Sequence, residues 1–543
     1  MEALLTFSTY PLGLNCFLPQ QYIPFPSVGS LSCRYPRRIC SINSRKVSYV
    51  RAISASSAVS SPPVTPKEED EESEERFDWF GNWYPVAPVC DLDKKVPHAK
   101  RVIGLDVVIW WDPVERTWRV FNDRCPHRLA PLSEGRIDSA GRLQCVYHGW
   151  CFSGAGDCKF IPQAPPDDPP VHTSKRACVA VYPSCEQNKI VWFWPNSDPQ
   201  FKDILSKKRP PCIDEIDDPS YTSIFGIREI PYGYEVLIEN LMDPAHVPYA
   251  HYKIMPMPKA ATAGRIKRDR EGGAPLDMTV QKLDVTGYIA SQERGYSKFI
   301  APCVFCAYPK WEEKNDGSAS SASINNTKLE KASANATQQK KRALLVFLCI
   351  PVSPGQSRLI WVFPRNFSLW ANRLIPRWVF HVGQNLILDS DLYLLHVQER
   401  KIVEVGQDNW HKACYVPTKS DALVTGFRRW LRKYGSIPWD PKFSDGFPPT
   451  PPKEQLMDRY WTHVVHCSSC RAAEKGLKVL EVSLQVVSIG LIGVIAALKQ
   501  NTLSSVARNL LVSTAIVCFI ASKWLSHFVY KNFHFHDYNH AIV

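Results

Sequence analysis

Two short segments, CPHR at residues 125–128 and CVYHGWCF at residues 145–152, limit how the N-terminal half of this chain can fold. Each segment contains one cysteine and one histidine: Cys125 and His127 in the first, Cys145 and His148 in the second. Two thiolates and two imidazoles can hold a zinc ion in a closed tetrahedron. They can also divide between the two irons of a 2Fe–2S cluster.

The spacing within the two segments favours the cluster. One residue separates the cysteine and histidine of the first pair and two separate those of the second, so each short loop can offer one thiolate and one imidazole. A Rieske cluster is bound in this way, with the cysteines on one iron and the histidines on the other. Neutral imidazoles raise its potential, so it accepts electrons readily from a ferredoxin. Such a cluster cannot insert oxygen by itself, so a second site is expected.

The segment ENLMDPAHVPYAH at residues 239–251 supplies candidates for that site. Asp243 precedes a proline, which is typical of a helix N-cap, and His246 would then lie one turn further on. Pro248 is expected to bend the chain so that His251 converges on His246. Two histidines and one carboxylate, with open positions, form the facial triad of non-heme Fe(II) oxygenases.

Together these motifs resemble the oxygenase subunits of Rieske non-heme iron oxygenases. The resemblance implies that His246 and His251 bind a mononuclear iron. It further implies that Asp243 bridges electron transfer, by hydrogen bonding an iron-ligand histidine and a Rieske histidine of a neighbouring subunit. The resemblance also implies a ring-like oligomer, usually a trimer, because the two metal sites within one chain lie too far apart for electron transfer between them.

The carboxylate ligand must come from further along the chain. Five acidic residues lie in or near a helix predicted at residues 378–405: Asp389, Asp391, Glu399, Glu404 and Asp408. The family pattern has an acidic ligand followed seven residues later by glutamine, which Asp391 and Gln398 match. Ser390 is a small departure, because relatives carry Glu or Gln there. The alternative for Asp391 is an ordinary aspartate on the helix surface.

The chain is predicted to be α+β, with an all-β Rieske domain followed by a helix-grip-like α/β catalytic domain and a helical hairpin. The predicted parts are a transit peptide at 1–66, the Rieske domain at 77–200, the catalytic domain at 201–450 with a disordered insertion at 314–343, a linker at 451–476 and two transmembrane helices within 477–530.

Charge is unevenly distributed along the chain. Of a formal net charge of +12, the first 66 residues carry six basic residues, only one acidic residue and twelve serines. This composition is typical of an organelle transit peptide, although a merely disordered tail is the alternative. The remainder has no basic tract with interleaved aromatic residues, so nucleic acid is excluded as an expected partner.

Near the C-terminus, residues 482–498 and 509–522 carry no charge, and the second run extends to 530 if Lys523 snorkels. A hydrocarbon core of about 30 Å needs roughly 20 helical residues. The runs therefore predict a membrane hairpin, with a buried pair of core helices as the alternative.

The transit peptide, the hairpin, the pair Cys467 and Cys470 and the segment 239–251 together resemble the chloroplast pheophorbide a oxygenase branch of the family. Segments 77–85 and 427–434 (FRRWLRKY) point to one member within it. The resemblance implies oxygenation of a chlorophyll-related tetrapyrrole by O2 and ferredoxin-derived electrons, with protochlorophyllide a (ring methyl to formyl) as the expected substrate. Pheophorbide a oxygenation in chlorophyll breakdown and a redox-sensing subunit of a chloroplast import translocon are the alternatives. The implied location is the inner envelope or thylakoid membrane, with the soluble domains facing the stroma.

Cys467 and Cys470 can close a disulfide or share a metal. Cys303 and Cys306 have the same spacing but lie in an apolar, strand-like run, which favours core packing. Cys467 is expected in an exposed, electropositive stretch beside the membrane, where thioredoxin could reduce a Cys467–Cys470 disulfide. Two free cysteines with no role are the alternative.

Overall fold

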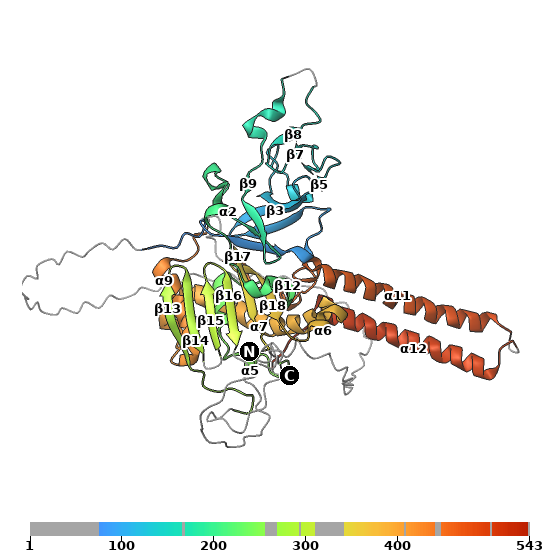
Figure 1. Ribbon diagram of the computed structural model, residues 1–543. Coiled ribbons are helices and arrows are strands. Elements are labelled where there is room, and N and C mark those ends of the chain that lie inside the picture. The colour runs from blue at the N-terminus through green and yellow to red at the C-terminus, as the bar shows by residue number, and fades with distance from the viewer. Residues whose placement is uncertain are drawn as a thin grey trace, which may run out of the picture. The chain divides into compact units, whose positions relative to one another are not determined.

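The computed structural model describes residues 75–165, 169–255, 269–292, 295–309, 341–406, 409–439, 447–499 and 502–540. The predicted transit peptide and most of the predicted insertion at 314–343 lie outside these residues. Within them the chain is α+β, as predicted, with small β-sheets first, then one large sheet with helices, and a helical hairpin last (Figure 1).

Small antiparallel sheets make up the N-terminal part of the described chain, ordered β1-β11-β10, β2-β3-β4-β9 and β5-β6-β7-β8. The strands are β1 Tyr84–Pro88, β2 His98–Val102, β3 Leu105–Asp112, β4 Thr117–Asn122, β5 Arg136–Ile137, β6 Leu143–Gln144, β7 Cys151–Phe152, β8 Cys158–Phe160, β9 Val181–Tyr182, β10 Ser184–Gln187 and β11 Ile190–Phe193. Trp110, Phe121 and Phe152 pack in one buried core with Cys125 and Cys145. This core holds the two Cys–His loops, which follow β4 and β6.

A seven-stranded antiparallel sheet, ordered β12-β18-β17-β16-β15-β14-β13, forms the second part. Its strands are β12 Thr222–Ile230, β13 Met278–Asp284, β14 Gly287–Gln292, β15 Gly295–Ile300, β16 Val304–Pro309, β17 Leu345–Ser353 and β18 Gln356–Arg365. Every residue of β17 is buried, which accounts for its run of apolar residues from Leu345 to Val352.

The three longer helices of this part, α4 (Tyr234–Met242), α7 (Arg377–Val405) and α9 (Ala422–Tyr434), pack on this sheet or against one another beside it. Helix α4 contacts β17 and β18, α9 contacts β13 and β14, and α7 contacts α4 and β12. The helix predicted at 378–405 is thus confirmed. Shorter helices are α2 Ile204–Lys207, α3 Asp214–Asp217, α5 Val247–Ala250, α6 Leu369–Leu374, α8 Trp410–Ala413 and α10 Lys453–Leu456.

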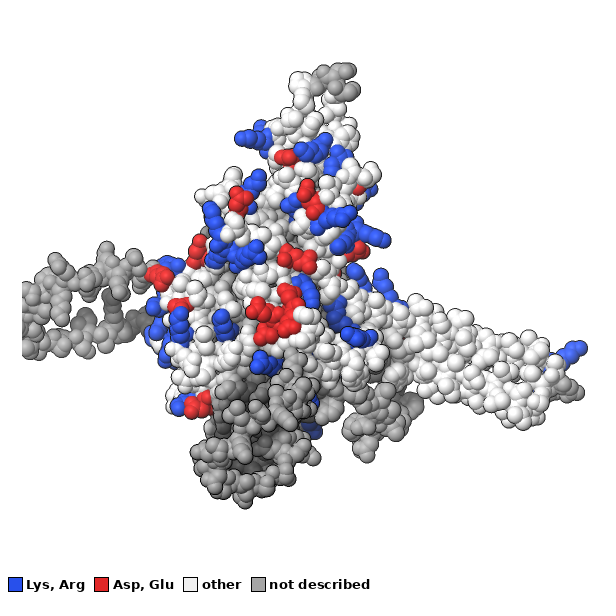
Figure 2. Space-filling model, viewed as in Figure 1, with Lys and Arg blue, Asp and Glu red and all other residues white. Residues whose placement is uncertain are grey.

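The two apolar runs near the C-terminus form α11 (Ser468–Ala497) and α12 (Ser505–Val529), which lie side by side as a hairpin (Figure 1). Both are long and apolar enough to cross a membrane, and only 6% and 11% of their most apolar windows are buried within the chain. Little of this surface is covered by protein, unlike that of a pair of core helices. On the face shown in Figure 2 the hairpin carries no charged side chain between its base and its tip. Helix α11 begins inside the stretch 451–476 that was predicted as a linker.

Candidate functional site

The two Cys–His loops have matching backbone hydrogen bonds. In the first, the N–H of Leu129 donates to the carbonyl of Cys125 at 2.8 Å, and in the second the N–H of Gly149 donates to that of Cys145 at 2.9 Å. Both Leu129 and Gly149 adopt positive φ angles, of 61° and 76°. Each loop thereby folds its cysteine inward and presents its histidine beside it.

The side chains of these loops converge and fit a Rieske cluster. The rings of His127 and His148 lie 4.3 Å apart, and Trp150 stacks on His127. The Nδ1 atom of His127 is buried and has no hydrogen-bond partner among the described residues. Burial raises the pKa of the Cys125 thiol to about 12, so a thiolate there needs a compensating cation. Two buried thiols and the two converging imidazoles of His127 and His148 are the donor set of a Rieske 2Fe–2S cluster.

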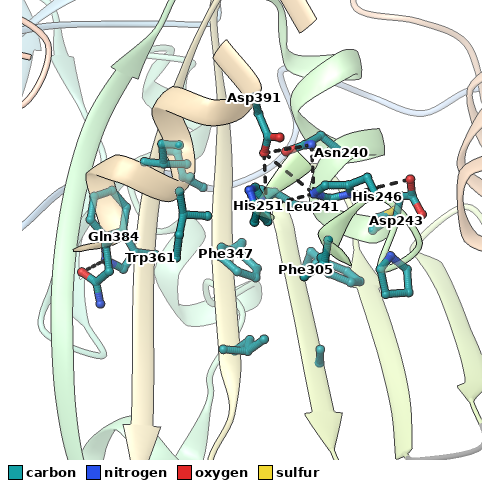
Figure 3. Close-up of a pocket in the computed structure, with 18 of the residues that line it drawn as sticks. Asn240, Leu241, Asp243, His246, His251, Phe305, Phe347, Trp361, Gln384 and Asp391 are labelled. Carbon is teal, nitrogen blue, oxygen red and sulfur yellow. Dashed lines mark hydrogen bonds and ion pairs between the residues drawn. The ribbon is translucent and has the colours of Figure 1, made fainter. Parts of the chain in front are cut away.

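The second constellation forms where α4 ends against α7. His246 is the N-cap residue of α5 and His251 follows its last residue, while Asp391 comes from the middle of α7. The two Nε2 atoms of the histidines lie 3.2 Å apart. Oδ2 of Asp391 lies 3.8 Å from Nε2 of His246 and 3.6 Å from Nε2 of His251 (Figure 3). These three ligand atoms can hold a single metal ion.

Ser390 and Asn240, which sequence reasoning did not assign to the site, orient these ligands. The Ser390 hydroxyl donates to the carbonyl of Ile387 at 2.6 Å and therefore accepts from Nδ1–H of His251, at 2.7 Å. That bond leaves Nε2 of His251 with its lone pair directed at the site. The amide of Asn240 donates to Oδ2 of Asp391 at 3.3 Å.

The protonation equilibria of the three groups also fit a metal ion. Burial raises the pKa of Asp391 to about 6, against the opposing influence of His246 and Asn240. Burial and the nearby His246 lower the pKa of His251 to about 3. Burial also opposes protonation of His246, but its contacts with Asp243 and Asp391 outweigh burial and raise its pKa. A divalent cation would stabilise the ionised carboxylate and the neutral imidazoles together.

The expectation that Asp243 is a helix N-cap is wrong. Asp243 is the C-cap residue of α4, with φ −93° and ψ 102°. The physical reason is Pro244, whose ring disfavours helical geometry in the residue before it. Oδ1 of Asp243 accepts a hydrogen bond from the N–H of Ala245, and Oδ2 lies 3.6 Å from Nδ1 of His246. The carboxylate therefore lies behind the imidazole, on the side away from Asp391.

The other acidic candidates do not reach the two histidines. Asp389 forms buried ion pairs with Arg228 and Arg459. Glu399 accepts a hydrogen bond from the N–H of Gly233, and Glu404 pairs with Lys401 on the surface. Asp408 lies outside the described residues. Of the described candidates, Asp391 alone joins the pair.

A pocket of about 820 Å³, open solvent at its mouth included, has these ligands in its wall. A volume of this size suits a small organic ligand. Most of the lining is apolar and comes from β16, β17, β18 and α7. The apolar side chains of the lining include Phe305, Leu345, Phe347, Leu359, Trp361, Phe363, Ile387 and Leu388. Figure 3 labels three of them, Phe305, Phe347 and Trp361. Polar groups are few, and Gln384 accepts a hydrogen bond from the indole N–H of Trp361 at 2.9 Å.

Comparisons with known proteins agree with this geometry. Residues 82–183 match the Rieske [2Fe-2S] domain and residues 299–409 match pheophorbide a oxygenase. A chloroplastic pheophorbide a oxygenase of Oryza sativa subsp. japonica is 32% identical over 89% of this chain and 91% of its own. This chain belongs to the pheophorbide a oxygenase family. It is therefore a Rieske non-heme iron mono-oxygenase, as its motifs predicted.

Two further members of the pheophorbide a oxygenase family are more similar. The chloroplastic protochlorophyllide-dependent translocon component 52 of Arabidopsis thaliana is 57% identical over 90% of this chain and 91% of its own. The chloroplastic flavonoid 8-hydroxylase 2 of Ocimum basilicum is 51% identical over 89% of this chain and 90% of its own. The particular likeness indicated by segments 77–85 and 427–434 was to the translocon component, and it is confirmed.

The expected exposure of Cys467 is wrong. Cys467 and Cys470 are buried, and both thiols are free. The cause is the segment before them: the carbonyl of Thr462 accepts from the N–H of Glu229 on β12, which draws the start of α11 against the sheet. Cys303 and Cys306 are also buried, in agreement with the prediction of core packing.

Proposed function

We propose that this protein oxygenates a chlorophyll-related tetrapyrrole, with protochlorophyllide a as its substrate and the conversion of a ring methyl to a formyl as its reaction. The observation that carries the proposal is the pocket, where an apolar wall rich in aromatic side chains meets the His246, His251 and Asp391 group. A planar, largely apolar macrocycle can pack against such a wall, with its reacting edge directed at these ligands.

In this proposal Cys125, His127, Cys145 and His148 hold one 2Fe–2S cluster, and His246, His251 and Asp391 hold one ferrous ion. When bound, the iron would supply activation of dioxygen, with electrons delivered through the cluster from ferredoxin. The chain's own contribution is to orient both imidazoles, His251 through Ser390 and His246 through Asp243, and to exclude water with the apolar wall.

The overall reaction needs two oxygenations. Each consumes one O2, two electrons and two protons, places one oxygen in the substrate and releases one water. The first converts the methyl to a hydroxymethyl group, and the second gives a geminal diol that loses water to form the formyl group.

Asp243 is proposed to link the two metal sites of neighbouring subunits in a trimer. Its position behind Nδ1 of His246, with a partly exposed carboxylate, supports this role. The Asp243 side chain can then accept a hydrogen bond from His246 and another from a Rieske histidine of the next subunit.

The site is proposed to work at a chloroplast membrane, either the inner envelope or the thylakoid, with α11 and α12 crossing the bilayer and the soluble parts in the stroma. The relatives carry chloroplast names, and the two helices have the length and hydropathy that a bilayer requires.

A second candidate substrate is a flavonoid. The relative from Ocimum basilicum is named as a flavonoid hydroxylase and is 51% identical to this chain over 488 aligned residues. A flavonoid is also flat and aromatic, so the wall formed by Phe347, Trp361 and Phe363 suits it as well. Its hydroxyl and carbonyl groups could bond Gln292 or Gln384 at the pocket wall.

The deciding experiment uses the full-length protein, purified without oxygen, reduced by ferredoxin and mixed with isotopically labelled O2. Protochlorophyllide a, pheophorbide a and a flavone are added in separate reactions, and the masses of the products are measured by mass spectrometry. The proposal expects a protochlorophyllide product that gains labelled oxygen and loses two hydrogens. Oxygen gain on the flavone alone, or on pheophorbide alone, would replace the proposed substrate by that compound.

The substitution His246→Ala distinguishes the proposed enzyme from a non-enzymatic redox sensor in an import translocon. Substrate oxidation lost with cluster absorbance intact supports the enzyme. An import or redox phenotype that depends on the cluster but survives this substitution would favour the sensor.

A further inference from the structure

Four metal-binding side chains meet at a second buried point, between α7 and the start of α11. His381 comes from α7, His463 precedes the turn Val464–His466, and Cys467 and Cys470 lie at the N-cap and in the first turn of α11. One ligand atom from each lies within 4.8 Å of all the others. All four side chains are nearly inaccessible, with exposed fractions of 0 to 2%.

Hydrogen bonds to strand β12 orient both imidazoles toward the sulfur atoms. Nε2–H of His381 donates to the carbonyl of Phe225 at 2.9 Å, and Nδ1–H of His463 donates to the carbonyl of Ile227 at 2.6 Å. Each carbonyl can only accept, so the proton of each neutral ring lies on that side. The remaining nitrogens, Nδ1 of His381 and Nε2 of His463, carry lone pairs that face the two thiols. This arrangement of a backbone carbonyl behind an imidazole is typical of metal-ligating histidines.

The distances match one tetrahedral ion. Nδ1 of His381 lies 3.3 Å from Sγ of Cys470 and 3.5 Å from Sγ of Cys467, and Nε2 of His463 lies 3.2 Å from Sγ of Cys470. Zinc bonds of about 2.3 Å to sulfur and about 2.0–2.1 Å to nitrogen place the nitrogen and sulfur atoms of a tetrahedron roughly 3.5 Å apart.

We propose that His381, His463, Cys467 and Cys470 bind a structural Zn²⁺. Two thiolates and two imidazoles fill the four positions that zinc prefers in closed structural sites, leaving none for water or substrate. Both rings are buried, and burial disfavours the charged imidazolium, so the neutral form that metal binding requires is favoured.

A disulfide between Cys467 and Cys470 suits these surroundings less well. It would remove both thiol protons and leave the lone pairs of two buried imidazoles facing sulfur atoms that can no longer donate. A zinc ion satisfies all four groups together.

The proposed ion would join three parts of the protein. It would fasten the base of the hairpin α11–α12 to α7, and through the carbonyls of Phe225 and Ile227 to β12. Helix α7 also carries Asp391, so the same helix would meet both mononuclear metal sites. The proposal is independent of the substrate, because none of the four residues lines the pocket.

The test is elemental analysis of the full-length protein in detergent after dialysis against a weak chelator. The wild type is expected to keep about one zinc per chain beside its iron. The zinc content of the double variant Cys467→Ser/Cys470→Ser should be lower than that of the wild type by roughly tenfold or more. Its Rieske paramagnetic signal should be retained, which checks that the variant is folded. The matched control is Cys303→Ala/Cys306→Ala, which removes a buried pair of the same spacing and should keep the zinc.

A second measurement needs no variant. Wild-type protein grown with Co²⁺ in place of zinc should show the intense visible absorption of tetrahedral cobalt with thiolate ligands, and both thiols should resist alkylation until a strong chelator is added. Zinc-free protein with a Cys467–Cys470 disulfide in mass spectrometry would overturn the proposal. So would equal zinc in the wild type and the Cys467→Ser/Cys470→Ser variant.

Discussion

Asp389 and Asp391 stand two positions apart on α7, and their carboxylates point to opposite partners. Asp389 is enclosed by the guanidinium groups of Arg228 and Arg459, whereas Asp391 faces Nε2 of His246 and Nε2 of His251. Residues two positions apart on a helix project to different sides. One turn of α7 therefore supplies both a structural ion-pair network and a candidate metal ligand.

Asp391→Ala should remove the mononuclear iron and leave the Rieske cluster in place. The substitution deletes the only charged ligand, so two neutral imidazoles remain to hold a divalent ion. Iron analysis together with the paramagnetic signal of the reduced cluster measures both sites. Glu404→Ala, which alters an exposed acidic residue on the same helix, is the control and should keep all iron. Iron lost from the control and kept in Asp391→Ala would move the ligand to another residue.

Asp389→Asn should destabilise the fold and leave both metal sites loaded. It leaves two buried guanidinium groups without a full countercharge, and breaking a buried pair costs on the order of 3–5 kcal/mol. We expect thermal unfolding at a clearly lower temperature with unchanged iron content. Unchanged unfolding combined with iron loss would contradict the separation of the two aspartates.

Ser390→Ala should weaken iron binding without abolishing it. Nδ1–H of His251 would lose its acceptor, and the ring would be free to turn or change tautomer. The apparent affinity for Fe²⁺ should fall by roughly 10- to 100-fold. Dialysis against graded chelator measures this. Ser390→Thr keeps a hydroxyl and should restore binding, whereas equal loss in both variants would indicate a packing defect instead.

Asp243→Asn should leave both metals bound and slow electron transfer between them. Asparagine can still accept from the N–H of Ala245, so the local turn is preserved, but the negative charge behind His246 is removed. Rapid-mixing absorbance of the reduced cluster, with substrate and O2 present, follows the transfer directly. Equal rates of electron transfer in the variant and the wild type would contradict the bridging role of Asp243.

Glu399→Gln should change how stability depends on pH. Burial raises the pKa of Glu399 to about 7, against the opposing hydrogen bond from Gly233, and Oε2 is buried without a partner among the described residues. At pH values between the pKa of Glu399 in the unfolded chain and its higher pKa in the folded chain, the folded chain binds the proton more tightly than the unfolded chain. The free energy of unfolding therefore falls as the pH rises through this range. The loss amounts to at most roughly 3 kcal/mol.

The variant should therefore be more stable than the wild type at about pH 8, with the difference shrinking toward about pH 5. Urea unfolding of both proteins at the two pH values measures it. A difference independent of pH would show that Glu399 does not titrate in this window.

The motifs allowed much of the site to be predicted, because the spacing of Cys125, His127, Cys145 and His148 is itself a ligand geometry. Asp391 was predicted in another way, from a family pattern with glutamine seven positions later, and its carboxylate lies beside both histidines. Contacts between distant segments could not be predicted. No local signal shows that Ser390 meets His251, or that His463 and the pair Cys467 and Cys470 fold under β12, since tertiary hydrogen bonds determine both.

The error at Asp243 has a more specific cause. An aspartate before a proline fits a helix start and a helix end equally well when only the sequence is considered. Helix α4 already occupied the preceding residues, and the proline therefore ended that helix.

The two Rieske loops, alike in their hydrogen bonds, differ in stored strain. Gly149 adopts its left-handed backbone at little cost, whereas Leu129 adopts the same conformation with a side chain, at roughly 1–2 kcal/mol. The backbone hydrogen bonds from Leu129 to Cys125 and from Cys125 to Ala130 hold the first loop in this costlier conformation. In protein without the proposed cluster, the first loop therefore has more to gain than the second from leaving this conformation.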